Sequence, residues 1–121
     1  MRFKQTAVAH EYFHILLNGK RGLLRKLIKR INIDDFLNKD TMIKFGYMYD
    51  DSLNIRINAM EDCIIRAMCG VVTEDKDIES YCKTNIQCGF VGVPAMIEKI
   101  NEIDFTQLNI NDIISKMTES Y

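Results

Sequence analysis

The stretch "AVAHEYFHILLN", residues 7–18, contains both histidines of the 121-residue chain. His10 and His14 are four residues apart among mostly apolar residues, a pattern typical of a helix that packs against a core. The pattern predicts a helix over residues 6–17, which ends at the following Asn-Gly pair because Gly19 tolerates the conformation that commonly closes a helix. On this helix, the two histidines lie on one face, one turn apart.

Glu11 directly follows the first histidine and completes the pattern His-Glu-x-x-His. Imidazole nitrogens of His10 and His14 can hold one Zn²⁺ ion at roughly 2.0–2.1 Å, with Glu11 beside the metal. There, a carboxylate can take a proton from a zinc-bound water, and the resulting hydroxide attacks an amide carbonyl. We therefore expect a zinc site with Glu11 as the general base. The alternative is an accidental match, in which the histidines are ordinary polar groups of a helix.

A catalytic zinc site takes three protein ligands, so a third ligand is needed. The stretch "IRINAMEDCIIRAMCGVV", residues 55–72, has apolar residues at helical spacing and predicts a second helix near residues 56–72. Glu61 falls within the apolar face of this helix, whereas Asp62 points away from it. A carboxylate aimed at the core is costly unless it is paired or binds a metal, which selects Glu61 as the third ligand. A capping box, formed by Asn58 and Glu61, is the competing interpretation.

Three segments resemble the ImmA/IrrE-type metallopeptidases, gluzincin-like proteins of bacteria and their mobile elements. "RFKQTAVAHEYFHILL" (2–17) is similar to that family's entry into its active-site helix. "EDCIIRAMCGVV" (61–72) resembles its second helix, and "GFVGVPAMIEKI" (89–100) is similar to a later segment. The resemblance implies a zincin-like core with Glu61 as the third zinc ligand. It also implies hydrolysis of a narrow protein substrate, such as a helix-turn-helix repressor that binds DNA.

The chain departs from the family pattern in two places. His14 and Glu61 are separated by 46 residues, which is longer than the common spacing. Only nine residues precede His10, whereas the family's strands lie upstream of the active-site helix. We therefore expect a short or truncated member, or a sheet built from another segment such as 42–57. The rival interpretation is a non-catalytic interaction or regulatory protein that keeps the helical scaffold.

The remaining segments complete the expected fold. "MIKFGYMY" (42–49) and "LNIRI" (53–57) alternate in polarity and predict a small β-hairpin, although the second run also fits the first turn of the next helix. After a charged linker at 73–77, residues 77–100 predict two short helices around a glycine-rich turn, with Pro94 starting the second. A further helix is expected near the C-terminal end. The fold class is mainly α (α+β), in one domain over residues 1–121.

Positive charge is concentrated at the start of the chain. Residues 1–30 carry eight Lys or Arg and one acidic residue, whereas the rest of the chain is acidic. Residues 20–31 place Leu and Ile at helical spacing and predict an amphipathic helix with a cationic outer face. This face is either solvated or a docking surface for an acidic protein, nucleic acid or an anionic membrane. Its candidate partner-binding residues are Arg25, Lys26, Lys29 and Arg30.

The sequence also indicates the cellular compartment of the protein and the role of its cysteines. The sequence has no apolar run of 18 residues and no signal-peptide pattern, so we expect a cytoplasmic protein without membrane contact. Direct binding of nucleic acid is not expected. The four cysteines are spaced more widely than the pairs of structural zinc sites. In a reducing cytosol, they are best interpreted as small core residues.

Overall fold

A computed structural model describes residues 6–72, 77–103 and 110–121 of the chain. These residues form seven α-helices and one short 3-10 helix, and no strand is present among them. The helices are α1 (Thr6–Leu17), α2 (Arg21–Arg30), α3 (Lys39–Lys44), α4 (Leu53–Val72), α5 (Ile78–Gln87), α6 (Val93–Glu102) and α7 (Ile110–Glu119), and the 3-10 helix is Ile33–Asp35. The mainly α fold class is therefore confirmed.

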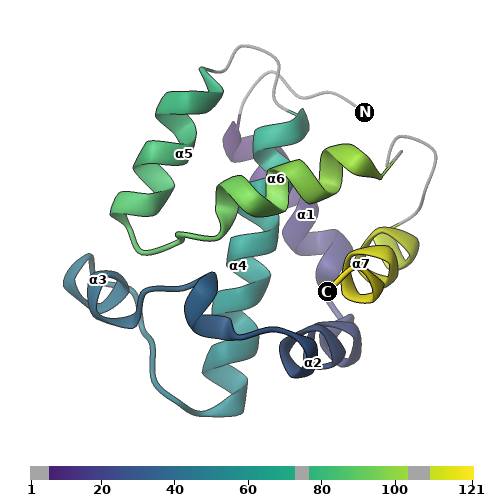
Figure 1. The fold of residues 1–121 in the computed structure, drawn as a ribbon, viewed down its shortest axis with the longest axis horizontal. Helices are drawn as coiled ribbons and strands as arrows, with labels where there is room; N and C mark the ends of the chain where they lie inside the picture. Colours follow the sequence, from purple (N-terminus) through teal and green to yellow (C-terminus); the bar gives the residue numbers. More distant parts are fainter. Residues whose placement is uncertain (1–5, 73–76, 104–109) are drawn as a thin grey trace.

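Helix α4 lies at the centre of the fold. It is the longest helix, with 20 residues, and it contacts α1, α2, α5 and α6 (Figure 1). Its buried side chains are not confined to one stripe, since the neighbours Ile64 and Ile65 are both fully buried. A helix that is apolar on several sides is typical of a position surrounded by other elements. Side chains of α4 are therefore available to partners on more than one side.

Helix α1 packs against α4 through a stripe of apolar residues. Ala9, Phe13 and Leu17 follow one another at four-residue spacing and are almost completely buried. The predicted bounds of this helix are confirmed, and Gly19 after its end has a φ of 84°. The histidines directly follow Ala9 and Phe13 in sequence and so lie at the edge of the buried stripe. This packing aims them at α4.

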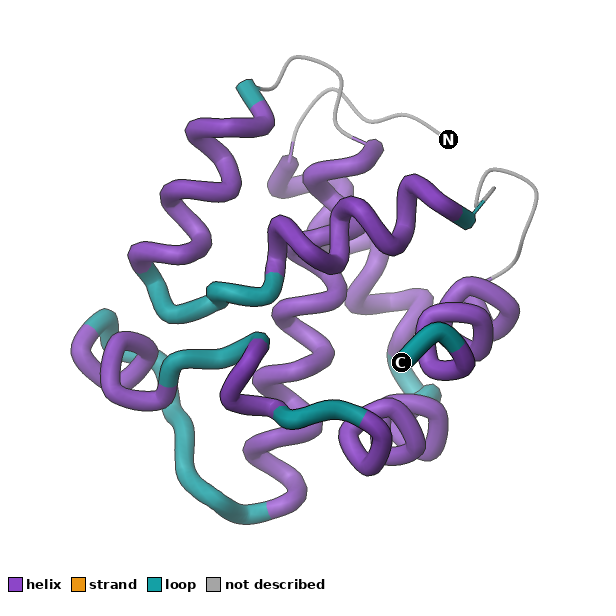
Figure 2. The backbone as a smooth tube through the Cα atoms, viewed as in Figure 1, coloured by secondary structure: helices purple, strands orange, loops and turns teal. Residues whose placement is uncertain are grey.

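The predicted hairpin over residues 43–57 is wrong. Helix α3 ends at Lys44, a loop follows, and α4 begins at Leu53 (Figure 2). Ser52 starts the helix, because its hydroxyl accepts a hydrogen bond from the backbone N–H of Ile55 at 3.4 Å. The two-residue alternation in this stretch is short, whereas α4 continues for 20 residues and buries apolar side chains from Ile57 to Val72.

Helices α5 and α6 confirm the two predicted helices around a glycine-rich turn. Pro94 lies in the first turn of α6, where its missing N–H leaves no hydrogen bond unmade. The turn docks against the segment before α3: Gly92 N–H donates to the carbonyl of Phe36 at 3.0 Å, and Asn38 N–H donates to the carbonyl of Gly89 at 2.8 Å. Residues 73–76 of the predicted linker lie outside the described residues.

The basic helix and the cysteines are also found largely as expected. Helix α2 buries Leu24, Leu27 and Ile28 and turns its cationic side outward. All four cysteines are free: Cys63 and Cys69 are buried, and the two on and after α5 are partly buried. Among the described helices, none combines the length and the apolar character that a membrane span requires.

Close packing between Gly92 and Phe36 yields a first prediction. A Cβ at Gly92 would lie 2.3 Å from Cδ1 and 2.7 Å from Cα of Phe36, so backbone as well as side chain must move. We expect Gly92→Ala to lower the free energy of unfolding by about 1–3 kcal/mol, measured by urea denaturation.

The matched control is Gly22→Ala on α2, where an added Cβ meets nothing within 4 Å. Alanine favours a helix over glycine by roughly 0.8–1.0 kcal/mol, so this variant should be slightly more stable than the wild type. Equal stability of the two variants would contradict the close approach of the turn to Phe36.

Candidate metal centre

The two histidines of α1 face each other at metal-binding distance. Nε2 of His10 lies 3.0 Å from Nε2 of His14, and their ring centroids are 4.6 Å apart. One zinc ion with Zn–N bonds of roughly 2.0–2.1 Å can bridge two nitrogens at this separation. Both side chains are partly buried. The helical spacing that predicted a shared site is therefore realised in the structure.

Asp62 supplies a carboxylate on the same side. Its Oδ1 lies 3.8 Å from Nε2 of His10, and one potential ligand atom from each of His10, His14 and Asp62 lies within 4.8 Å of the others. This oxygen is buried, and Nε of Arg66 lies 3.3 Å from it in an ion pair. A carboxylate oxygen has two lone pairs, so it can contact this cation and still bind a metal ion. Two imidazoles and one carboxylate form a donor set that catalytic zinc uses.

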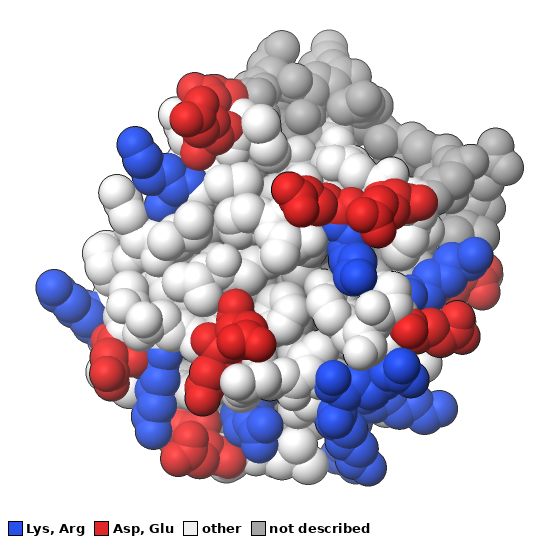
Figure 3. Space-filling model, in the orientation of Figure 1, with Lys and Arg blue, Asp and Glu red and all other residues white. Residues whose placement is uncertain are grey.

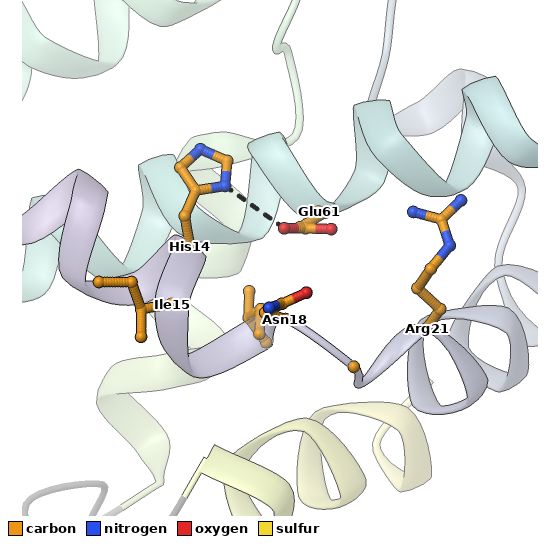
Figure 4. Close-up of a pocket in the computed structure, with 7 residues that line it drawn as sticks. His14, Ile15, Asn18, Arg21 and Glu61 are labelled. Carbon is orange, nitrogen blue, oxygen red and sulfur yellow. Dashed lines mark hydrogen bonds and ion pairs between the residues drawn. The ribbon is translucent and has the colours of Figure 1, made fainter.

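Glu61 contacts the opposite nitrogen of the second histidine. Its Oε1 lies 3.3 Å from Nδ1 of His14, and its side chain is 17% exposed. A dashed line marks this contact in Figure 4. A hydrogen bond from Nδ1–H to this carboxylate leaves Nε2 of His14 unprotonated and directed toward His10. Metal-binding histidines commonly donate their other ring N–H to a carboxylate in this way. As placed here, Glu61 orients the ring of His14, and its predicted direct bond to zinc stays a prediction.

Two details of the sequence interpretation are corrected by α4. The capping box at Asn58 is wrong, because the helix begins five residues earlier at Leu53 and Asn58 accepts a hydrogen bond from Arg21 at 2.7 Å. Asp62 was expected to point away from the core, but its side chain is only 24% exposed and lies toward His10. The signal that was missed is the apolar character of α4 beyond one face, seen at Cys63 and its neighbours.

The electrostatics favour the neutral, metal-binding form of His10. Burial lowers the pKa of His10, the negative charge of Asp62 partly opposes this, and His14 lowers the pKa further. At pH 7, the ring is therefore neutral, as metal coordination requires. Glu11 is exposed on α1 and is close enough for its charge to act weakly on His10. Its carboxylate is thus accessible to solvent, one residue along α1 from His10.

An open cleft adjoins the centre. It has a volume of about 320 Å³ and is lined by residues from the end of α1, together with Arg21 and Glu61 (Figure 4). Ile15, one turn after Glu11 on α1, lines it with a side chain that is 73% exposed. The cleft therefore joins the metal-centre residue His14 to an accessible apolar surface.

The cationic residues of α2 form a separate surface. Arg25, Lys26, Lys29 and Arg30 are all exposed. Figure 3 shows blue side chains gathered at the lower right, where α2 lies in Figure 1. Arg30 donates to the backbone carbonyl of Glu119 at 3.4 Å, which ties the end of α2 to α7. The predicted partner-binding role of these residues stays a prediction.

Comparison of the chain with known protein families, with curated protein sequences and with solved structures finds no match. The resemblance to the ImmA/IrrE-type metallopeptidases therefore rests on the sequence segments described above, and the residue roles that it implies stay predictions.

The geometry predicts which substitutions remove the metal. Protein purified without a polyhistidine tag should hold close to one zinc per chain, and His14→Ala should lose it, because one of three ligands is missing. Asp62→Asn should bind zinc much more weakly but still measurably, because both imidazoles and an amide oxygen remain. Glu61→Gln should weaken binding by about 10–100-fold, since it removes only the acceptor of the His14 N–H. Metal analysis and competition with a chromophoric chelator give the stoichiometry and the affinity.

The same set of variants shows whether Asp62 or Glu61 is the third zinc ligand. If Glu61→Gln abolishes binding while Asp62→Asn binds zinc as tightly as the wild type, then Glu61 is the ligand, as the sequence alone predicts. Stoichiometric zinc in His14→Ala would rule out the whole centre. Circular dichroism of each variant in the presence of EDTA controls for loss of the fold.

Proposed function

We propose that this protein is a zinc-dependent metallopeptidase that hydrolyses a peptide bond in a specific protein substrate. The observation that carries the proposal is the placement of two imidazole nitrogens 3.0 Å apart, with Oδ1 of the largely buried Asp62 carboxylate 3.8 Å from Nε2 of His10. One of these residues, His14, lines an open cleft together with Glu61. Zinc is the proposed metal, because two nitrogens and one oxygen suit zinc better than the all-oxygen sites of Mg²⁺ or Ca²⁺.

Each residue of the centre has a distinct proposed task. A bound zinc ion would supply Lewis acidity and lower the pKa of a coordinated water toward about 7. Glu11, exposed next to His10, accepts a proton as the general base and returns it to the leaving amine as the general acid. Glu61 keeps His14 in the tautomer whose Nε2 is free for the metal. In this proposal, His10, His14 and Asp62 are the ligands.

The cleft favours a segment of a protein as the substrate. Its exposed apolar wall at Ile15 suits an apolar side chain of an extended peptide next to the scissile bond. The resemblance to ImmA/IrrE-type enzymes suggests a helix-turn-helix repressor as that protein. We therefore place the activity in the cytoplasm, where such a repressor acts, and propose binding to the repressor rather than to DNA.

A second candidate is an interaction or regulatory protein that lacks catalysis. Zincin peptidases align their substrate along a sheet, but the described residues contain no strand. The exposed side chains of Val8 and Ile15 leave the outer face of α1 uncovered in this part of the chain. In this candidate function, the exposed cations of α2 would contact an acidic partner.

Glu11→Gln distinguishes the enzyme from the binding protein. The variant should keep the zinc and the fold, because Glu11 is not a ligand, but lose roughly 10²–10⁴-fold in rate, because the general base is gone. Cleavage of a repressor encoded beside this gene can be followed by gel and mass spectrometry, with the zinc content measured in the same samples. Equal cleavage by the variant and the wild type would refute the mechanism.

If neither protein cleaves the repressor but both bind it, the second candidate gains support. Neutralising Arg25, Lys26, Lys29 and Arg30 should then weaken binding and flatten its dependence on salt, as expected for exposed charge pairs. Unchanged affinity and salt dependence would exclude the basic face as the contact.

A further inference from the structure

Arg66 is a largely buried cation that neutral groups hold in place. Its side chain is 19% exposed. One terminal nitrogen donates to Oδ1 of Asn85 at 2.9 Å, and the other donates to the hydroxyl of Tyr47 at 2.9 Å. The guanidinium carbon lies 4.1 Å from the ring centroid of Phe90, a cation–π contact. Three partners from different parts of the chain therefore fix the plane of the guanidinium.

The partners of Arg66 are themselves anchored. Asn85 is a buried polar residue, and its amide donates to the carbonyl of Tyr81 at 2.9 Å. Tyr81 in turn donates from its hydroxyl to the carbonyl of Arg66 at 2.7 Å. The ring of Tyr47 packs edge-on against Phe90, with centroids 5.2 Å apart. A cation held by such a closed set of contacts has little freedom to rotate.

The side of Arg66 that these partners leave open faces the metal centre. Nε of Arg66 lies 3.3 Å from Oδ1 of Asp62, one turn earlier on α4. The contact is an ion pair between two buried atoms. The same oxygen lies 3.8 Å from Nε2 of His10. Asp62 is thus between a fixed cation and the two histidines.

We propose that Arg66 is a positioning residue of the metal centre: its fixed guanidinium holds the Asp62 carboxylate toward His10 and His14. This inference rests on the metal site of the proposed function. An isolated carboxylate is costly to bury, and the neighbouring cation offsets that cost. The cation also limits the rotamers of Asp62, so less conformational entropy is lost when the metal binds. Since a carboxylate oxygen has two lone pairs, Oδ1 can contact Arg66 and a metal ion at the same time.

The proposal predicts the metal affinity of variants at Arg66. Arg66→Gln should bind zinc about 10–100-fold more weakly than the wild type, the loss typical of removing a group that orients a ligand. Arg66→Lys keeps the charge but not the fork of donors, so it should recover part of the affinity. Tyr47→Phe keeps the ring and removes one hydrogen bond, so it should cause a smaller loss. Competition with a chelator and the visible spectrum of bound Co²⁺ report the affinity and the ligand geometry.

A double-mutant cycle tests whether Arg66 acts through Asp62. In the Asp62→Asn background, Arg66→Gln should cause no further loss of metal affinity, because the carboxylate that it positions is already gone. A purely structural role would lower the affinity equally in both backgrounds. Arg56→Gln is the matched control, since Arg56 lies ten residues earlier on α4, about 15 Å along the helix axis. This control should leave the affinity unchanged.

The outcomes separate this inference from the proposed function. A wild-type protein that binds no zinc would overturn both. A wild type that binds zinc, with Arg66→Gln and Tyr47→Phe binding equally tightly, would overturn the role of Arg66 alone. Tighter binding by Arg66→Gln would also overturn it, because Arg66 would then compete with the metal for Asp62. If Arg66→Gln fails to fold in EDTA, Arg66→Lys and Tyr47→Phe decide the question.

Discussion

The contact between α1 and α4 is the constraint on which the centre depends. Ala9, Phe13 and Leu17 form a continuous buried stripe, and burying such side chains provides on the order of 25 cal/mol per Å² of apolar surface. This contact fixes the rotation of α1 about its own axis. His10 follows Ala9 and His14 follows Phe13. Both histidines must then project toward Glu61 and Asp62 on α4. Two carboxylates and two imidazoles are brought together by apolar packing rather than by their own attraction.

Local sequence patterns were sufficient for most of the helices but not for the segment before α4. The apolar stripe and the Asn-Gly pair define α1, and Pro94 marks the start of α6, because these signals act within one or two turns. Residues 53–57 satisfy both a two-residue and a helical period over their short length. The choice between the two depends on Ser52 at the helix start and on helices that cover α4 from several sides. Neither condition can be read from five residues.

The candidate site shows the same division between local and distant information. The pairing of His10 with His14 follows from spacing alone, since both lie on one helix. The different positions of Glu61 and Asp62 depend on where α1 crosses α4, and adjacent helical residues differ by about 100° in direction. The surroundings of Arg66 are still less predictable, because Asn85 and Tyr47 are each 19 residues away.

The apolar stripe between α1 and α4 also determines what kind of metal centre the fold can hold. In a zinc finger, the metal replaces a missing core, and the chain unfolds without it. Here, the two helices that carry the candidate ligands are joined by a buried apolar stripe, to which the candidate ligands do not belong. A metal ion at the proposed centre would therefore not be needed to build the core. Occupancy of the proposed centre would then follow the free zinc concentration, as for an exchangeable site and not a structural one.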